Sequence, residues 1–244
     1  MSNGCSCHPP STRRSSSDAG LNPLNVVLIG PPGSGKGTQA VRIAERLSIP
    51  HISTGDILRA AVKAQVPLGR AVAQTLAAGA LVSDEIITEL VRDRLAAADT
   101  ARGFILDGFP RTEGQARSLD AMRPPDSLRV ILIVVADEAI VRRLSSRRVC
   151  DACAITQSVA PGDETEKEAC PYCGGNLVRR VDDHPDTVRR RLATYALVAR
   201  PVVDFYRARY GSEGSAGFVA IDGLRHADVV TNEIVAFVTG RGGT

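Results

Sequence analysis

NVVLIGPPGSGKGT, residues 25–38, is the stretch that decides the fold of this chain. Val26 to Ile29 form a continuous apolar run of the length that a strand buried on both faces of a parallel sheet has. The glycine-rich loop that follows then lies at the carboxyl end of this strand, where open α/β sheets bind their ligands. Apolar residues at helical spacing between Ala40 and Leu47 predict a helix directly after the loop.

The loop has the spacing of a phosphate-binding loop. Gly30 to Lys36 match the first seven positions of the G-x-x-x-x-G-K-[ST] pattern, in which backbone N–H groups and the lysine hold phosphate oxygens. A glycine-rich turn without a ligand is the plainer alternative, but the strand before the loop and the helix after it favour phosphate binding. The backbone can adopt positive φ at the glycines of the loop, which carry no Cβ, namely Gly30, Gly33, Gly35 and Gly37.

The eighth position of the pattern, usually Ser or Thr, is Gly37 here, and Thr38 comes one place later. This departure argues against direct Mg²⁺ ligation by a loop hydroxyl and favours water together with another carboxylate. Asp107 is our candidate, because residues 103–107 predict a strand that ends on this aspartate. The alternative for Asp107 is a turn or helix-capping role. Arg111 follows closely, and its guanidinium can fork onto phosphate oxygens.

Length and charge narrow the class of protein. The 244 residues can form one core with insertions, and the net charge of +3 arises from intermixed signs, which indicates neither a nucleic-acid nor a membrane surface. We find no apolar run near the roughly twenty residues of a membrane span and no secretory core, so we expect a soluble, cytoplasmic protein. Residues 1–23 are rich in Ser, Pro, Gly and Arg and should be disordered, with a transit peptide as a minor alternative.

Two helical regions flank the expected site. Helical patterns replace strands across residues 53–82 and predict a small helical insertion, after which Ser83 is expected to cap a helix. Pro185 and Asp186 should start a long helix that carries three consecutive arginines, residues 189–191. Because these three point in different directions around a helix, at most one or two of them can reach a ligand.

Four cysteines form two Cys-x-x-Cys pairs, Cys150 with Cys153 and Cys170 with Cys173, separated by sixteen residues. Two thiolates three positions apart can bind one ion, and two such pairs complete a tetrahedral zinc site. All four ligands then come from the protein, so the metal is expected to be structural. The residues between the pairs are acidic and include no aromatic side chain, which argues against a nucleic-acid finger.

Several independent motifs in one order resemble the adenylate kinase family. The likeness runs from about Asn25 to the final helix, and the cysteine pairs look like the zinc-bearing lid of the long form of that family. The motifs are GPPGSGKGT at Gly30–Thr38, STGDILR at Ser53–Arg59, LDGFPRTEGQ at Leu106–Gln115, SSRRV at Ser145–Val149 and RVDDHPDTVRRRL at Arg180–Leu192.

The resemblance implies an α/β fold, with a P-loop parallel sheet flanked by helices over residues 24–240. Residues 53–82 would be an AMP-binding insertion, and residues 146–183 would be a small zinc-binding lid that closes over ATP. The implied reaction is reversible, Mg²⁺-dependent phosphoryl transfer from ATP to AMP, which gives two ADP. The implied partners are these nucleotides, without nucleic acid or membrane, and the implied state is a monomer.

The resemblance also implies residue roles, carried over from the matching motifs. The implied catalytic residues are Lys36, Asp107, Arg111, Arg147, Arg180 and Arg191. The implied AMP ligands are Thr54, Arg59, Ala80, Leu81, Val82, Gly108, Phe109, Pro110, Arg111, Gln115, Arg180 and Arg191. The implied ATP ligands are Gly33, Ser34, Gly35, Lys36, Gly37, Thr38, Arg143, Arg147, Thr156, Gln157 and Arg225, where Thr156–Gln157 replace an aromatic residue that the family often has in its lid.

Two rival functions stay open at this point. One is a kinase for UMP or CMP on the same fold, although Thr54 and Gln115, which the resemblance places at the acceptor base, favour AMP. The other is a nucleotide-dependent binding or regulatory module that uses a zinc ribbon as its contact surface. That module predicts a basic ribbon with aromatic side chains, whereas the residues between the cysteine pairs are acidic.

Overall fold

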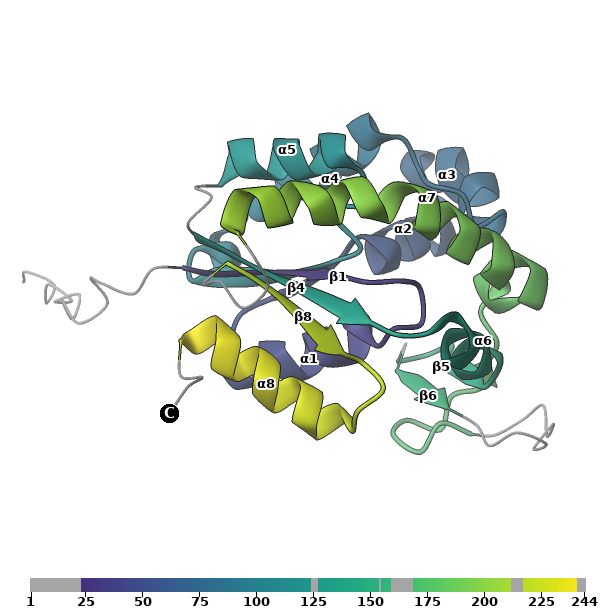
Figure 1. The fold of residues 1–244 in the computed structure, drawn as a ribbon. Helices are drawn as coiled ribbons and strands as arrows, with labels where there is room; N and C mark the ends of the chain where they lie inside the picture. The colour runs from purple at the N-terminus through teal and green to yellow at the C-terminus, as the bar shows by residue number, and fades with distance from the viewer. Residues whose placement is uncertain (1–22, 124–126, 154, 159–168, 212–216, 241–244) are drawn as a thin grey trace, which may run out of the picture.

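The computed structural model describes residues 23–123, 127–153, 155–158, 169–211 and 217–240, so all but the last residue of the expected disordered tail lies outside it. The core is a five-stranded parallel sheet in the order β2-β3-β1-β4-β8 (Figure 1). Its strands are β1 (Leu24–Ile29), β2 (His51–Ser53), β3 (Gly103–Asp107), β4 (Leu128–Val134) and β8 (Phe218–Asp222). The predicted P-loop α/β sheet is therefore confirmed.

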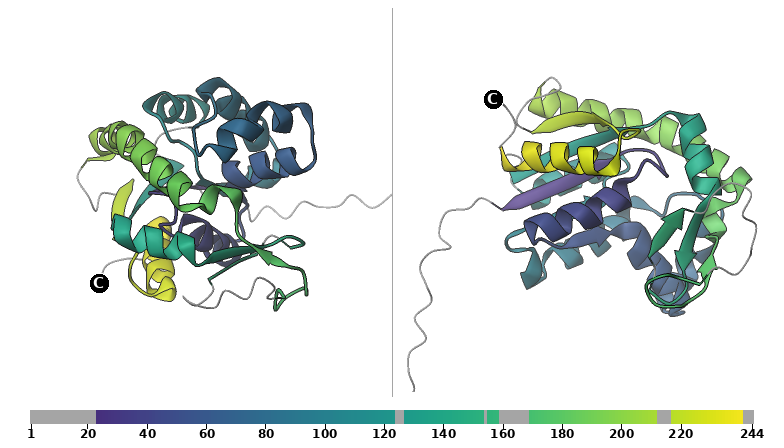
Figure 2. Two further views of the ribbon diagram at one scale, coloured as in Figure 1. Left: turned by 90° about the vertical axis from the view of Figure 1, so that its right-hand side faces the viewer. Right: turned by 90° about the horizontal axis from the view of Figure 1, so that it is seen from below.

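Helices cover both faces of this sheet, which explains why its strands are apolar on both sides. Val26 and Leu28 of β1 pack into one buried cluster and Val27 and Ile29 into the other, as side-chain alternation in a strand requires. On the first face lie α1 (Lys36–Leu47) and α8 (Ala227–Thr239), side by side in Figures 1 and 2. On the second face lie α4 (Asp84–Leu95), α5 (Glu113–Met122) and α7 (Pro185–Tyr210).

Two further helices, α2 (Thr54–Lys63) and α3 (Pro67–Ala77), form a pair between β2 and α4, where the sequence predicts helices. They approach closely at Gly69, where an added Cβ would lie 2.0 Å from the Ala61 carbonyl oxygen. Ser83 is the N-cap residue of α4, but among the described residues its side chain makes no capping hydrogen bond. The predicted start of this helix at Ser83 is confirmed, and its backbone carbonyl accepts from the Ile87 N–H at 3.2 Å.

A second sheet lies between α6 (Asp137–Ser145) and α7. Its antiparallel strands, in the order β6-β5-β7, are β5 (Arg147–Cys150), β6 (Thr156–Ser158) and β7 (Leu177–Val178). Its described buried cluster holds only two cysteines and Leu177, with Ile155 packed alongside. Hydrophobic packing alone gives this sheet little stability. None of the helices that the structure describes has the length and apolarity to cross a membrane.

Candidate active site

The loop of residues 30–35 joins β1 to α1 at the carboxyl end of the central sheet. Gly33 has a φ of 81°, and a Cβ added there would lie 2.8 Å from Leu144, so conformation and space both favour glycine. Lys36 folds back over the loop, where its Nζ donates to the carbonyl oxygens of Gly30 at 2.7 Å and Pro31 at 2.8 Å. The loop, the lysine and the start of α1 together offer N–H donors and positive charge, the features to which phosphate oxygens bind.

Positive φ occurs at three of the four loop glycines but not at Gly37. Gly37 does not use this freedom, because α1 already begins at Lys36 and places Gly37 inside the helix. A Cβ on Gly37 would lie 3.4 Å from Oδ2 of Asp107. The carboxylate predicted at the end of β3 therefore lies beside the first turn of α1, directly after the loop, and the parallel pairing of Leu28 with Asp107 fixes this position.

Asp107 lies near His51 and Lys36, two side chains that favour its ionised form. The Nε2 atom of His51 is 3.8 Å from its Oδ2, a contact that the sequence analysis missed because β2 and β3 are distant in sequence. Burial raises the pKa of Asp107, but His51 and Lys36 outweigh burial and leave the pKa below its usual value. Burial also lowers the pKa of Lys36 to about 8, although the charge of Asp107 opposes this shift.

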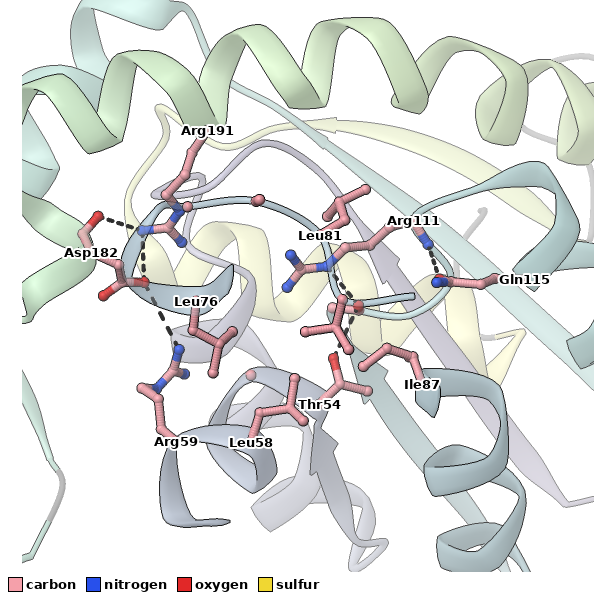
Figure 3. A pocket seen from close by; sticks show the side chains of 15 residues that line it. Thr54, Leu58, Arg59, Leu76, Leu81, Ile87, Arg111, Gln115, Asp182 and Arg191 are labelled. Carbon is pink, nitrogen blue, oxygen red and sulfur yellow. Dashed lines mark hydrogen bonds and ion pairs between the residues drawn. The ribbon is translucent and has the colours of Figure 1, made fainter. Parts of the chain in front are cut away.

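A cavity opens between α2, α3, the start of α4 and the loop after β3 (Figure 3). It brings together most of the residues implied for AMP. Those that line it are Thr54, Arg59, Ala80, Leu81, Val82, Gly108, Arg111, Gln115 and Arg191. Of the others, Phe109 and Pro110 are buried in the same loop, and Arg180 lies 4.0 Å from Asp56.

The polar side chains at one end of the cavity are held by hydrogen bonds (Figure 3). The Thr54 hydroxyl donates to the Gly108 carbonyl at 3.0 Å, and Nε of Arg111 donates to the same oxygen at 2.8 Å. The Oε1 atom of Gln115 accepts from the Arg111 backbone N–H at 2.7 Å, and its Nε2 donates to Asp84 at 2.8 Å. Asp84 is a further residue that the sequence analysis missed, since it precedes Gln115 by 31 positions.

Cations exceed carboxylates at the other end of the cavity. Arg191 lies 2.9 Å and Arg59 lies 4.0 Å from Asp182 (Figure 3). Desolvation, followed by the charge of Arg191, lowers the pKa of Arg111, while burial and the charges of Arg59 and Arg147 lower that of Arg180 to about 10. Guanidinium groups held together in this way favour a bound anion.

Asp183, in the motif at residues 180–192, holds two of the implied catalytic arginines. Its side chain is fully buried and accepts from Nε of Arg147 at 2.6 Å, with Arg191 at 3.4 Å. Of the three consecutive arginines, Arg191 lines the cavity, whereas Arg189 and Arg190 are exposed. The motif contained Asp183, but its sequence neighbours gave no sign of which arginines it would pair with.

The residues implied for ATP are less closely grouped. Arg143 lies beside the phosphate loop, where it donates to the carbonyls of Ser34 at 3.4 Å and Gly223 at 2.8 Å. Thr156 and Gln157 lie on β6 of the small sheet, apart from the central sheet. Arg225 forms an ion pair with Glu233 of α8. Thr38 is exposed in the first turn of α1.

The two cysteine pairs converge in the small sheet. The four sulfur atoms lie within 4.8 Å of one another, with Cys150 and Cys170 buried and Cys153 and Cys173 exposed. Two of the separations are 3.4 and 3.7 Å, close to the roughly 3.8 Å between sulfurs on a tetrahedral zinc ion. The Cys153 N–H donates to the Cys150 sulfur and is the main group that lowers the pKa of that thiol to about 7. The cluster therefore fits a metal that binds four thiolates.

Known proteins match this chain over most of its length. The family model for adenylate kinase matches residues 28–210. A protein named adenylate kinase from Acidothermus cellulolyticus is 46% identical over 216 residues, which cover 87% of this chain and 97% of that protein. Adenylate kinases from Kosmotoga olearia and Archaeoglobus fulgidus are 44% and 39% identical, covering 86% and 88% of this chain and 97% and 98% of theirs.

These matches span the phosphate loop, the cavity and the small sheet alike. The stretch matched by the family model includes β3, which ends on Asp107. Since the family model covers well over half of the 244 residues, this chain belongs to the adenylate kinase family.

Proposed function

We propose that this chain transfers a phosphoryl group reversibly between ATP and AMP, giving two ADP, across the border between the phosphate loop and the arginine-lined cavity. One observation carries the proposal. Lys36 of the loop and Arg111 of the cavity are close enough that the charge of Arg111 lowers the pKa of Lys36, while both are attracted to Asp107. Two phosphate-binding sites that share one set of charges suit transfer between two nucleotides.

The proposed roles follow from what phosphoryl transfer requires, which is positioning and charge neutralisation rather than a covalent nucleophile. Lys36 and the loop N–H groups hold the donor phosphates, and Arg111 orients the acceptor phosphate. Arg147 and Arg191, both anchored on Asp183, neutralise charge on the group in transfer. Arg180, at the hinge of the proposed lid, adds a further positive charge beside the group in transfer. The lid excludes water from the site when it closes.

Mg²⁺ bound with ATP would neutralise phosphate charge, and Asp107 is the residue we propose to hold it, through water. The fit rests on three features of the site. The Asp107 carboxylate keeps a pKa below its usual value, lies beside position 37, and meets no loop hydroxyl there. Asp107 thus orients the metal-bound donor while the loop N–H groups hold its phosphates.

A direct test of the acceptor is the rate of ADP formation from ATP with each of AMP, CMP, UMP and GMP. We expect AMP to be the best acceptor, because Thr54 and Gln115 both present polar atoms to a base in the cavity. Loss of the Thr54 hydroxyl should reduce the preference by about 1–3 kcal/mol. Equal efficiency with CMP and AMP in the unaltered protein would contradict the assignment of Thr54, and ATP hydrolysis that is independent of AMP would contradict the kinase function.

The titration of Lys36 predicts a pH dependence of ATP binding. Bound phosphates favour the ammonium form, so they raise a pKa that stands at about 8 in the free protein. Affinity is then fully present below about pH 8 and falls about tenfold per pH unit above it, because binding must take up a proton. Calorimetry at pH 7.5 and about pH 9, in buffers of different ionisation enthalpy, measures both effects. Equal affinity at the two pH values would refute the prediction, and Lys36→Met should abolish the dependence.

We also propose that the four-cysteine cluster binds one structural Zn²⁺, since the small sheet has few apolar residues to stabilise it. Removing the metal should lower the thermal midpoint by several degrees and leave ATP binding at the phosphate loop intact. The measurements are metal stoichiometry, then melting curves and ATP titrations with and without a strong chelator. Unchanged melting after complete removal of the metal would rule out the structural role.

We propose further that the protein works as a monomer in the cytoplasm. All proposed ligands come from one chain, and thiols arranged as a metal site rather than as disulfides are typical of a reducing compartment. Sedimentation at several protein concentrations, with and without nucleotide, measures the assembly state.

A further inference from the structure

Gln115 is held from two sides by groups of opposite hydrogen-bonding character. Its Oε1 accepts from the Arg111 backbone N–H at 2.7 Å, and its Nε2 donates to Oδ1 of Asp84 at 2.8 Å. A backbone N–H can only donate, and an ionised carboxylate can only accept. The side-chain amide therefore has one favourable orientation, and Gln115, only 2% exposed, has little room for another.

Asp84 is itself fixed against the start of α5. Its Oδ2 accepts from the Thr112 hydroxyl, which in turn accepts the Gln115 backbone N–H at 3.2 Å. A Cβ added to Gly114 would lie 3.3 Å from the same Oδ2, so the two helix N-termini are in close contact. Asp84 is not among the residues that line the cavity, whereas Gln115 is. We therefore expect Asp84 to influence a bound base through Gln115.

The fixed amide has a defined polarity toward the cavity. After its two protein contacts, Gln115 keeps one oxygen lone pair and one N–H, so it offers an acceptor beside a donor. Adenine presents an amine donor beside a ring-nitrogen acceptor, which matches this pair. Hypoxanthine and guanine present the 6-oxo acceptor beside the N1–H donor, which is the reverse pattern. The Thr54 hydroxyl agrees with this polarity, because its hydrogen is committed to Gly108 and only its lone pairs remain.

We propose that Asp84 is a positioning residue for acceptor specificity: it locks the Gln115 amide in the orientation that accepts an amino-bearing base and rejects a 6-oxo purine. This inference rests on the proposed function, in which Gln115 faces the base of AMP. Cytosine carries the same amine beside a ring nitrogen, so the lock separates amino from oxo bases. Separation of purine from pyrimidine then depends on the apolar walls of the cavity, such as Leu58 and Ile87.

Asp84→Asn weakens the lock without removing it. An asparagine at this position can turn its own NH₂ toward Gln115 and so accommodate a flipped amide, but the Arg111 N–H still opposes the flip. Asp84→Ser, whose hydroxyl can also donate or accept, is a second variant with a smaller side chain. Glu85→Gln is the matched control, because Glu85 is exposed in the same first turn of α4 and its replacement removes the same charge.

The test is calorimetric titration with AMP and with IMP, without a donor nucleotide, for the unaltered protein, D84N, D84S, E85Q, Q115A and D84N/Q115A. The unaltered protein should bind AMP at least about 100-fold more tightly than IMP. D84N and D84S should each narrow this ratio about tenfold, partly through tighter IMP binding, and E85Q should leave it unchanged. In Q115A the ratio of AMP affinity to IMP affinity should already be low, and adding D84N should not lower it further.

The outcomes separate this inference from the proposed function. An unchanged ratio in D84N and D84S, or an equal loss of AMP and IMP affinity, would reduce Asp84 to a stabilising residue and overturn the lock. A lowered ratio in D84N that persists in the Q115A background would also overturn it, because Asp84 would then act by another route. Failure of the unaltered protein to make ADP from AMP would instead overturn the proposed function, and the lock with it.

Discussion

Replacing Lys36 by Met is expected to lower the turnover for ADP formation by about 10²-fold or more. Methionine keeps the length and most of the apolar stem of the side chain but removes the charge that neutralises the donor phosphates. The loop should stay folded, because the lost hydrogen bonds to Gly30 and Pro31 are offset by the loss of a desolvated charge, the same desolvation that lowers the pKa of Lys36 to about 8. The measurement is a coupled assay at saturating ATP and AMP, together with a melting curve.

Lys63→Met is the matched control for this variant. Lys63 is an exposed residue at the end of α2, and its Nζ donates to the Asp151 carbonyl at 3.1 Å rather than to the loop. Its replacement should change turnover less than threefold. A Lys36→Met protein that keeps a third or more of the original turnover would exclude Lys36 from the charges that stabilise the transferring group.

Asp183→Asn is expected to lower the free energy of unfolding by about 3–5 kcal/mol. Asp183 is fully buried and accepts from both Arg147 and Arg191, which are themselves less than a fifth exposed. An asparagine there keeps one acceptor but turns an NH₂ group toward a guanidinium, so a buried cation loses its partner. Turnover should fall as well, because both arginines are proposed to act on the group in transfer.

The measurement for Asp183→Asn is the urea midpoint, compared with that of Asp186→Asn. Asp186 lies in the first turn of α7 and pairs with Arg189, but both side chains are about 70% exposed, so water screens the pair. Its replacement should change the unfolding free energy by less than about 1 kcal/mol. Equal urea midpoints for the two variants would mean that the buried ion pairs of Asp183 stabilise the protein no more than the exposed pair of Asp186.

The sequence by itself determined the local framework of this protein. The apolar run before the glycine-rich loop predicted β1, and the run ending on Asp107 predicted β3 to the residue. The cysteine spacing predicted a four-sulfur cluster, because two cysteines three positions apart lie on one turn of the chain and can bind the same ion. These features depend on the periodicity and conformation of short segments, which the sequence carries directly.

Only the tertiary structure decided which side chains meet. His51 beside Asp107, Asp84 on Gln115 and Asp183 on Arg147 each join elements that lie far apart in sequence. Their pairing depends on strand register and helix packing, which no short segment specifies. Gly37 makes the same point locally, since glycine is a common signal for a turn but lies here inside α1. The start of a helix, and the neighbour packed against it, determine what such a residue does.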